Sequence, residues 1–169
     1  MDRDVDYAEY VTARRPALVR AAVLLGCPKP EAEDVAQSAL VRCYGAWARV
    51  RQATDPDAYV YRILVNCLRD SRARCWTDEI PSEILPEPET GRDLAEEITR
   101  GLAVRQALLG LSRDHREVLV LRFYADLSER QVAEVLRVPA GTVKSRTARA
   151  LAAPASGPAL TGLPGDRSG

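Results

Sequence analysis

The sequence has few of the residues from which enzymes build reactive sites. It contains a single histidine among 169 residues, and it has no glycine-rich phosphate-binding loop. Its four cysteines lack C-x-x-C spacing, and His115 cannot complete a common zinc set with them. We therefore expect reduced and mostly buried thiols, no metal, no cofactor and no enzymatic activity.

The sequence also lacks the hydrophobic segments that membrane insertion and export require. No run approaches the roughly 20 apolar residues that span a bilayer. The N-terminus, Met-Asp-Arg-Asp-Val-Asp, is acidic and has no apolar signal core, so a cytoplasmic location is expected. Hydrophobic residues make up 46% of the chain and charged residues 28%, which indicates a packed protein of one domain or two small ones.

The chain carries no excess of either charge, but its charges are unevenly placed. Basic and acidic residues number 12 and 10 in residues 1–77, 2 and 8 in residues 78–100, and 10 and 6 in residues 101–169. The middle segment therefore has a net charge of −6 and separates two mildly basic regions. A net charge of zero consequently does not argue against a nucleic-acid partner.

Composition divides the chain into four segments. Residues 77–90 contain three prolines and no helical period, which predicts an extended connector. The last residues, from Pro154, are rich in Gly, Pro, Ser and Ala and predict a disordered tail. We expect an all-α protein with helical domains at 1–77 and 101–153, joined by an extended acidic linker at 78–100 and followed by a tail at 154–169.

The N-terminal domain shows helical periodicity in three stretches. Apolar residues recur at helical spacing over residues 6–26, from about Pro30 to Trp47, and from Pro56 to about Arg74. The third stretch carries a polar face opposite its apolar one, consisting of Arg62, Asn66, Arg69, Arg72 and Arg74. With Tyr59, Tyr61 and Trp76 nearby, this face resembles a platform for single-stranded nucleic acid. An ordinary solvated arginine face is the alternative.

The C-terminal domain contains the pattern of a helix-turn-helix. Ser128 and Gln131 form a capping-box pattern, followed by an apolar stripe of Val132, Val135 and Leu136. A turn at about residues 137–141 leads to a second helix. Its inward positions are Val143, Ala150 and Leu151, and its outer face holds Thr142, Lys144, Ser145, Arg146 and Arg149.

The cations of this second helix indicate a DNA partner. Cations near a helix N-terminus oppose the helix dipole, so they are not explained by helix stability. Phosphate oxygens and base edges are natural partners for them. A solvated amphipathic helix with ordinary surface charge is the alternative interpretation.

These blocks resemble the two conserved regions of bacterial sigma factors. Residues 33–44 (EDVAQSALVRCY) and 56–70 (PDAYVYRILVNCLRD) are similar to region 2. Residues 113–124 (RDHREVLVLRFY) and the helix-turn-helix with GTVKSR at 141–146 are similar to region 4. With only these regions and a short linker, the chain resembles the extracytoplasmic-function group, closest to the actinobacterial SigE-family.

The resemblance implies a function in transcription initiation. Asp34, Gln37 and Arg42 match the surface that binds core RNA polymerase. The loop at about residues 50–57 and the arginine face of residues 62–74 match the part that opens and reads the −10 element on the melted non-template strand. The helix at 142–149 matches the reader of the duplex −35 element. An anti-sigma factor is a common further partner in the family.

Three residues depart from the family pattern. Ser38 replaces a usually acidic residue, which predicts a weaker polymerase contact. Pro139 stands where a side-chain cap is common, so capping is expected to shift to Thr142. Thr147 replaces a usually apolar residue and predicts looser packing of its helix.

Two other functions fit parts of the sequence. A duplex-only helix-turn-helix regulator would need a sensing or dimerising N-terminal domain, and a receiver domain would show alternating strands, which residues 1–77 do not. A degenerate sigma-like protein would bind polymerase or an anti-sigma factor without initiating transcription.

Overall fold

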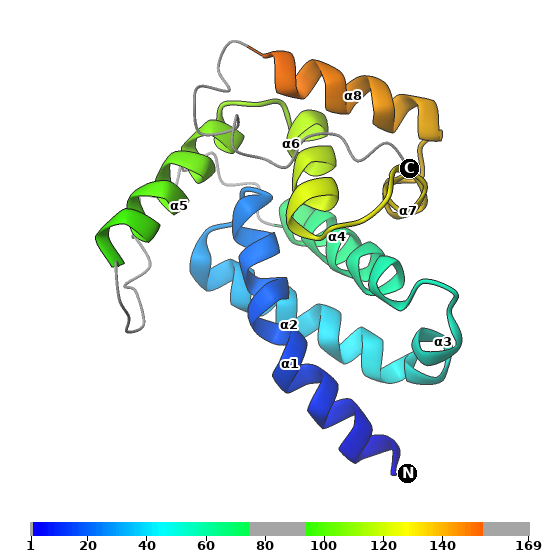
Figure 1. Ribbon diagram of the computed structural model, residues 1–169. Helices are drawn as coiled ribbons and strands as arrows, with labels where there is room; N and C mark the ends of the chain where they lie inside the picture. Colours follow the sequence, from blue (N-terminus) through cyan, green and yellow to red (C-terminus); the bar gives the residue numbers. More distant parts are fainter. Residues whose placement is uncertain (1, 75–93, 154–169) are drawn as a thin grey trace.

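A computed structural model describes residues 2–74 and 94–153, and every regular element in these ranges is helical, as the fold class predicted (Figure 1). The elements are α1 (Arg3–Leu24), α2 (Lys29–Gly45), α3 (Trp47–Gln52), α4 (Pro56–Arg74), α5 (Leu94–Leu109), α6 (Arg113–Leu119), the π-helical turn η1 (Val120–Tyr124), α7 (Glu129–Leu136) and α8 (Ala140–Ala152). Most of the predicted linker, and the whole of the tail predicted at 154–169, lie outside the described residues.

The N-terminal unit is a bundle of α1, α2 and α4, with α3 between α2 and α4. Its core contains Leu18, Leu40 and Leu64, one from each long helix and each at most 2% exposed. The loop predicted from about residue 50 is shorter than expected. The short helix α3 takes its place because Trp47 and Val50 are both buried and hold this segment on the bundle.

The C-terminal unit contains the predicted helix-turn-helix. The capping box at the start of α7 is present: Gln131 N donates to Ser128 Oγ at 3.1 Å, and Ser128 N donates to Gln131 Oε1 at 2.7 Å. Val132, Val135 and Leu136 are all buried, as the apolar stripe predicted.

The predicted start and inner face of the second helix need correction. Helix α8 begins at Ala140, so Gly141 is helical and Thr142 does not cap it; Pro139 takes the cap position without a side-chain hydrogen bond. Proline suits a helix start because its missing N–H would have no helical partner there. Leu151, expected to face inward, is 43% exposed, whereas Val143 and Ala150 are fully buried.

The two units pack against each other, which the sequence does not predict. One hydrophobic cluster contains buried residues from both units, α4 packs against α7, and α1 contacts η1. Figure 1 shows α6 and α7 lying over α4, with α8 crossing the far end of α6. Helix α5 begins at Leu94, before the predicted domain boundary at residue 101, so the end of the segment expected to be extended is helical.

The capping box supports the start of α7. Replacing the cap in Ser128→Ala removes the acceptor for Gln131 N, and we expect a loss of about 1 kcal/mol in the free energy of unfolding. Urea denaturation followed by circular dichroism measures the loss. The control is Ser145→Ala, an exposed serine whose hydroxyl donates only to the carbonyl one turn back, with an expected change below about 0.5 kcal/mol. Equal effects of the two substitutions would contradict the assignment.

Candidate nucleic-acid and polymerase interfaces

The arginine face of α4 is only partly open. Arg62 is exposed, whereas Asn66, Arg69 and Arg72 are half-buried. Arg74 ends α4, and its side chain lies outside the described residues. The structure therefore brings these residues onto one helix but leaves Arg62 as the exposed cation among those it describes.

The aromatic part of the predicted single-strand platform is not at the surface. Tyr61 is 6% exposed and belongs to the core, where burial raises the pKa of its hydroxyl to about 12. Tyr59 is partly buried against the same core, and Trp76 lies outside the described residues. The interpretation of these rings as stacking residues is wrong for Tyr61, because its position on α4 faces the bundle interior.

Arg69 contacts a buried carboxylate of the C-terminal unit. Its Nη2 donates to Glu117 Oε2 at 3.3 Å, and Glu117 is 2% exposed. The second carboxylate oxygen lies 3.5 Å from Arg113 Nε, one turn earlier on α6. A buried charge is tolerated when it is paired in this way, and here one of its partners comes from the other unit.

Arg72 and Arg116 meet at the end of α1. Arg72 Nη2 donates to the carbonyl oxygen of Leu25 at 2.6 Å, and Arg116 Nη1 donates to the same oxygen at 3.3 Å. The carbonyl belongs to the C-cap residue of α1, and the two guanidinium groups cap this end of the helix, where the dipole favours cations. Burial is the main cause that lowers the pKa of both guanidinium groups, and in Arg116 the charge of Arg72 lowers it further.

Gly26 provides the space for this meeting. Its φ is +102°, a conformation that side chains with a Cβ rarely adopt. A Cβ at this position would lie 2.5 Å from Arg116 Nη1. Glycine is therefore favoured here by the left-handed turn after α1, and its missing Cβ also leaves room for an arginine from the other unit.

The outer face of α8 presents most of the residues predicted to bind DNA. Lys144, Ser145 and Arg149 are exposed, and Thr142 is half-exposed. Arg146 is different, because its side chain is 26% exposed and its Nη2 lies 3.6 Å from Asp114 Oδ2 on α6.

The hydroxyl of Thr147, a polar residue on α8, has a hydrogen-bond partner within its own helix. The Thr147 hydroxyl donates to the carbonyl of Val143 at 2.7 Å, so its polar atom has a partner within the helix. The hydroxyl is therefore not left without a hydrogen-bond acceptor, and looser packing of the helix stays a prediction.

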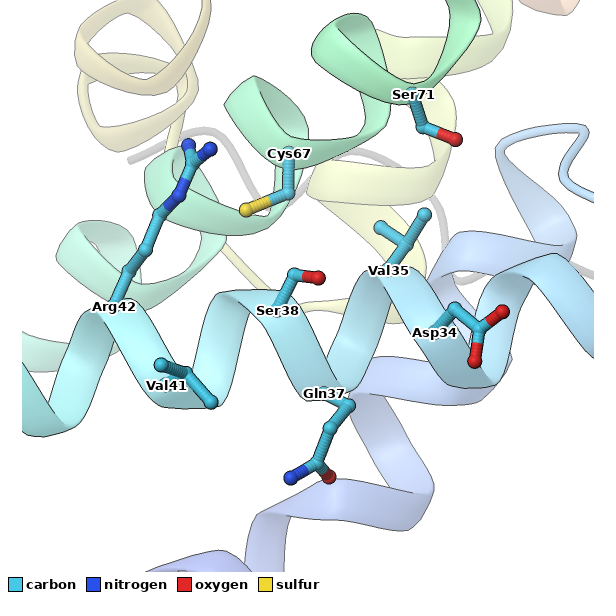
Figure 2. Close-up of a pocket in the computed structure, with 8 residues that line it drawn as sticks. All are labelled: Asp34, Val35, Gln37, Ser38, Val41, Arg42, Cys67 and Ser71. Carbon is cyan, nitrogen blue, oxygen red and sulfur yellow. The ribbon is translucent and has the colours of Figure 1, made fainter. Parts of the chain in front are cut away.

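The residues predicted to bind polymerase border a groove between α2 and α4. The groove has a volume of about 500 Å³ and is lined by Asp34, Val35, Gln37, Ser38, Val41, Arg42, Cys67 and Ser71. Figure 2 shows Val35, Ser38 and Arg42 projecting from α2 toward α4, whereas Gln37 projects away from it. All three residues predicted to bind polymerase are exposed and line the groove, although Gln37 and Arg42 project from different sides of α2.

Two features of this groove were missed in the sequence. Val41, an aliphatic side chain that lines the groove, is 61% exposed. Arg42 spans the groove, and its Nη2 donates to Asp70 Oδ2 of α4 at 2.9 Å. Val41 was recognisable only as an apolar residue off the period of the buried face of α2, and nothing local indicated the Arg42–Asp70 contact.

Searches of the described residues for other kinds of site gave negative results. None of the described helices is both long and apolar enough to cross a membrane. Within residues 2–74 and 94–153 no cluster of His, Cys, Asp and Glu could hold a metal ion. Three of the four cysteines, Cys27, Cys43 and Cys67, are buried, as was expected for the thiols.

Family models match both halves of the chain in the predicted order. The model described as Sigma-70 region 2 matches residues 10–77, and the model described as Sigma-70, region 4 matches residues 101–153. These ranges contain the groove and α4 in the first half and the helix-turn-helix in the second.

Proteins that are similar to this chain over most of its length include RNA polymerase sigma factors. The RNA polymerase sigma-E factor of Streptomyces coelicolor is 35% identical over 90% of this chain and 85% of its own length. A solved structure of CnrH in complex with the cytosolic domain of CnrY is 28% identical, with a TM-score of 0.60 over 86% of this chain and 82% of that one. The sigma factor RpoE in complex with the anti-sigma factor NepR, from Bartonella quintana, shares the fold at 23% identity, a TM-score of 0.64, and coverage of 86% and 91%.

Other matching relatives, including SigW of Bacillus subtilis, are named ECF RNA polymerase sigma factors. The match extends over both regions and most of the chain, and the structure arranges those regions as the two helical units that their sequences predicted. The chain therefore belongs to the sigma-70 family of RNA polymerase sigma factors, in its extracytoplasmic-function group.

Proposed function

We propose that this chain binds core RNA polymerase in the cytoplasm and directs it to specific promoters by binding alone, without catalysis. The observation that carries the proposal is the presence of both regions in one chain, each with its own exposed binding surface. Region 2 offers the groove between α2 and α4, and region 4 offers the outer face of α8.

Core polymerase is the proposed partner of the groove. An exposed aliphatic residue, Val41, lies among polar groups of Asp34, Gln37 and Arg42, a mixture that suits a protein partner better than a nucleic acid. Ser38 is exposed and lines the same groove. Its replacement of a usually acidic residue would therefore weaken the contact with polymerase directly.

Promoter DNA is the proposed partner of α8 and α4. Lys144, Ser145 and Arg149 would enter the major groove of the −35 element together with Thr142 and Arg146. The face of α4 with Arg62, Asn66, Arg69, Arg72 and Arg74 would hold the melted −10 strand, chiefly through phosphate contacts since Tyr61 is buried.

An anti-sigma factor is a further partner that we propose. The similar protein CnrH was solved with the cytosolic domain of another protein, CnrY, bound to it. The duplex-only regulator is not supported, because residues 2–74 are helical wherever they are regular and residues 10–77 match region 2.

Transcription in vitro with purified core polymerase tests the proposal. A promoter library transcribed with and without the chain should show new start sites that depend on it, because specificity arises when both regions are placed together on the enzyme. Polymerase binding without any new start site would instead support the degenerate sigma-like protein, and it would overturn the proposed function.

Lys144→Ala tests the −35 assignment. Lys144 is exposed on α8. If it contacts a base, its loss should reduce the free energy of binding to the −35 element by about 1–3 kcal/mol and lower transcription from −35-dependent promoters. Promoter-specific transcript yield measures the effect. The matched control is Arg130→Ala, which removes a cation that is 89% exposed on α7, outside the proposed face. A loss of similar size for both variants would show that only overall charge matters.

Val41→Asp tests the polymerase groove. A carboxylate in place of an exposed aliphatic side chain should raise the Kd for core polymerase at least tenfold, because it removes apolar contact and places an unpaired charge in the interface. Binding to immobilised core enzyme measures the change. The control Val5→Asp alters a valine that is 52% exposed on α1 and does not line the groove. Unchanged affinity of Val41→Asp would place the polymerase contact elsewhere.

A further inference from the structure

The same arginines that are proposed to hold promoter DNA are engaged inside the protein. Arg69 donates to Glu117 Oε2 of α6, and Arg72 donates to the Leu25 carbonyl that it shares with Arg116 of α6. A guanidinium group that is paired and half-buried in this way cannot track a phosphate backbone at the same time.

Carboxylates of helix α6 form ion pairs with proposed DNA-binding arginines of both regions. Its Glu117 holds Arg69 of region 2, and its Asp114 lies 3.6 Å from Arg146 of the −35 helix. The two contacts differ in strength, because Glu117 is buried whereas the Asp114 side chain is 56% exposed to screening by solvent. Glu117 therefore makes the stronger of these two ionic contacts, and it is the one that joins the regions, whereas Asp114 adds a weaker one within region 4.

The polar contact between the regions leaves some buried hydrogen-bond donors without acceptors. Arg69 Nε and Arg72 Nη1 are buried and find no hydrogen-bond acceptor among the described residues. Four guanidinium groups, from Arg69, Arg72, Arg113 and Arg116, surround the carboxylate of Glu117 and the carbonyl of Leu25. Unmet donors and like charges at close range make this polar part of the packing less favourable than a fully paired one.

Nucleic-acid phosphates would provide the acceptors that the closed packing lacks. Phosphate oxygens form strong, charge-assisted hydrogen bonds with guanidinium groups, and several can contact one arginine. DNA and Glu117 therefore compete for the same donors of Arg69. The competition makes DNA affinity depend on how much of the chain is open.

We propose that α6 is an intramolecular latch, in which Glu117 holds Arg69 and keeps region 4 packed on the promoter-binding face of region 2 until a partner separates them. This inference rests on the proposed function of α4. A second contact supports the closed packing without involving any DNA-binding residue: the Tyr124 hydroxyl donates to the Ala17 carbonyl of α1 at 3.3 Å.

The latch is tested in the full chain with Glu117→Gln, which keeps the shape of the side chain and removes its charge. The probe is a fluorescein-labelled single-stranded oligonucleotide of mixed sequence, with affinity measured by anisotropy at low salt. We expect about three- to tenfold tighter binding, because the open fraction rises. Small-angle X-ray scattering should show a larger radius of gyration for the same variant.

Glu134→Gln is the matched control. It makes the same change in net charge on α7, at a carboxylate whose partner is Arg130 and whose side chain is 57% exposed. Its oligonucleotide affinity and radius of gyration should stay at the wild-type values. Equal gains in both variants would show a general effect of charge and would overturn the latch.

Arg69→Ala separates release of the latch from a loss of DNA contact. In this background Glu117→Gln should no longer improve binding, because the side chain that it frees is absent. An undiminished gain would show that Arg69 is not the held residue and would overturn the proposal.

If Glu117→Gln fails to fold, as a loss of its helical circular dichroism signal would show, Tyr124→Phe provides a second test of the latch. This change removes the hydroxyl that contacts Ala17 and Arg20, both on α1, and it alters no charge. We expect a larger radius of gyration and a smaller gain in oligonucleotide affinity, about twofold. Wild-type values in both measurements would overturn the latch.

Transcription distinguishes the two proposals. If the wild-type chain directs no promoter-dependent initiation with core polymerase, the proposed function fails whatever the oligonucleotide results. If it does initiate, and Glu117→Gln changes neither free-chain binding nor the radius of gyration, the latch alone fails.

Discussion

The ion pair between Glu117 and Arg69 connects the two halves of the molecule, and the packing of the helices around it depends on that connection. Glu117 is almost completely buried, and a carboxylate removed from water is stable only when cations and hydrogen-bond donors replace its hydration. One partner, Arg113, lies on the same helix, whereas Arg69 comes from α4. Full compensation of the buried charge is therefore available only while the regions are in contact.

The end of α1 has a matching role on the other side of the same interface. Leu25 offers a carbonyl that no longer has a helical partner, and arginines from α4 and α6 both donate to it. The glycine that follows, Gly26, has no Cβ to obstruct Arg116. A helix terminus, a left-handed turn and a buried ion pair thus form one junction, and it includes Arg72, which is proposed to hold DNA. Regulation and recognition share side chains here because both use the affinity of guanidinium groups for oxygen acceptors.

Local patterns in the sequence were sufficient for the three long helices of the N-terminal unit and for the presence of the helix-turn-helix. The capping box of Ser128 and Gln131 and the buried stripe after it were predicted correctly, because they depend on residues three or four positions apart. Predictions failed where packing from outside the element decided the outcome. Tyr61 was placed at the surface although it lies in the core, and Leu151 was placed inside although it is exposed, since the period near a helix end does not show where the neighbouring helix stops.

The sequence by itself determined the all-helical fold, the order of its two regions, their membership of the sigma-70 family and the identity of the basic faces. Only the tertiary structure decided which of those basic residues are free. Arg62 and Lys144 are exposed, whereas Arg69 is held by a carboxylate 48 positions away in the chain. Helical periodicity and capping act over one or two turns and can be read from neighbouring residues. An ion pair between distant helices depends instead on how the helices pack, and on the low dielectric environment that the packing creates around it.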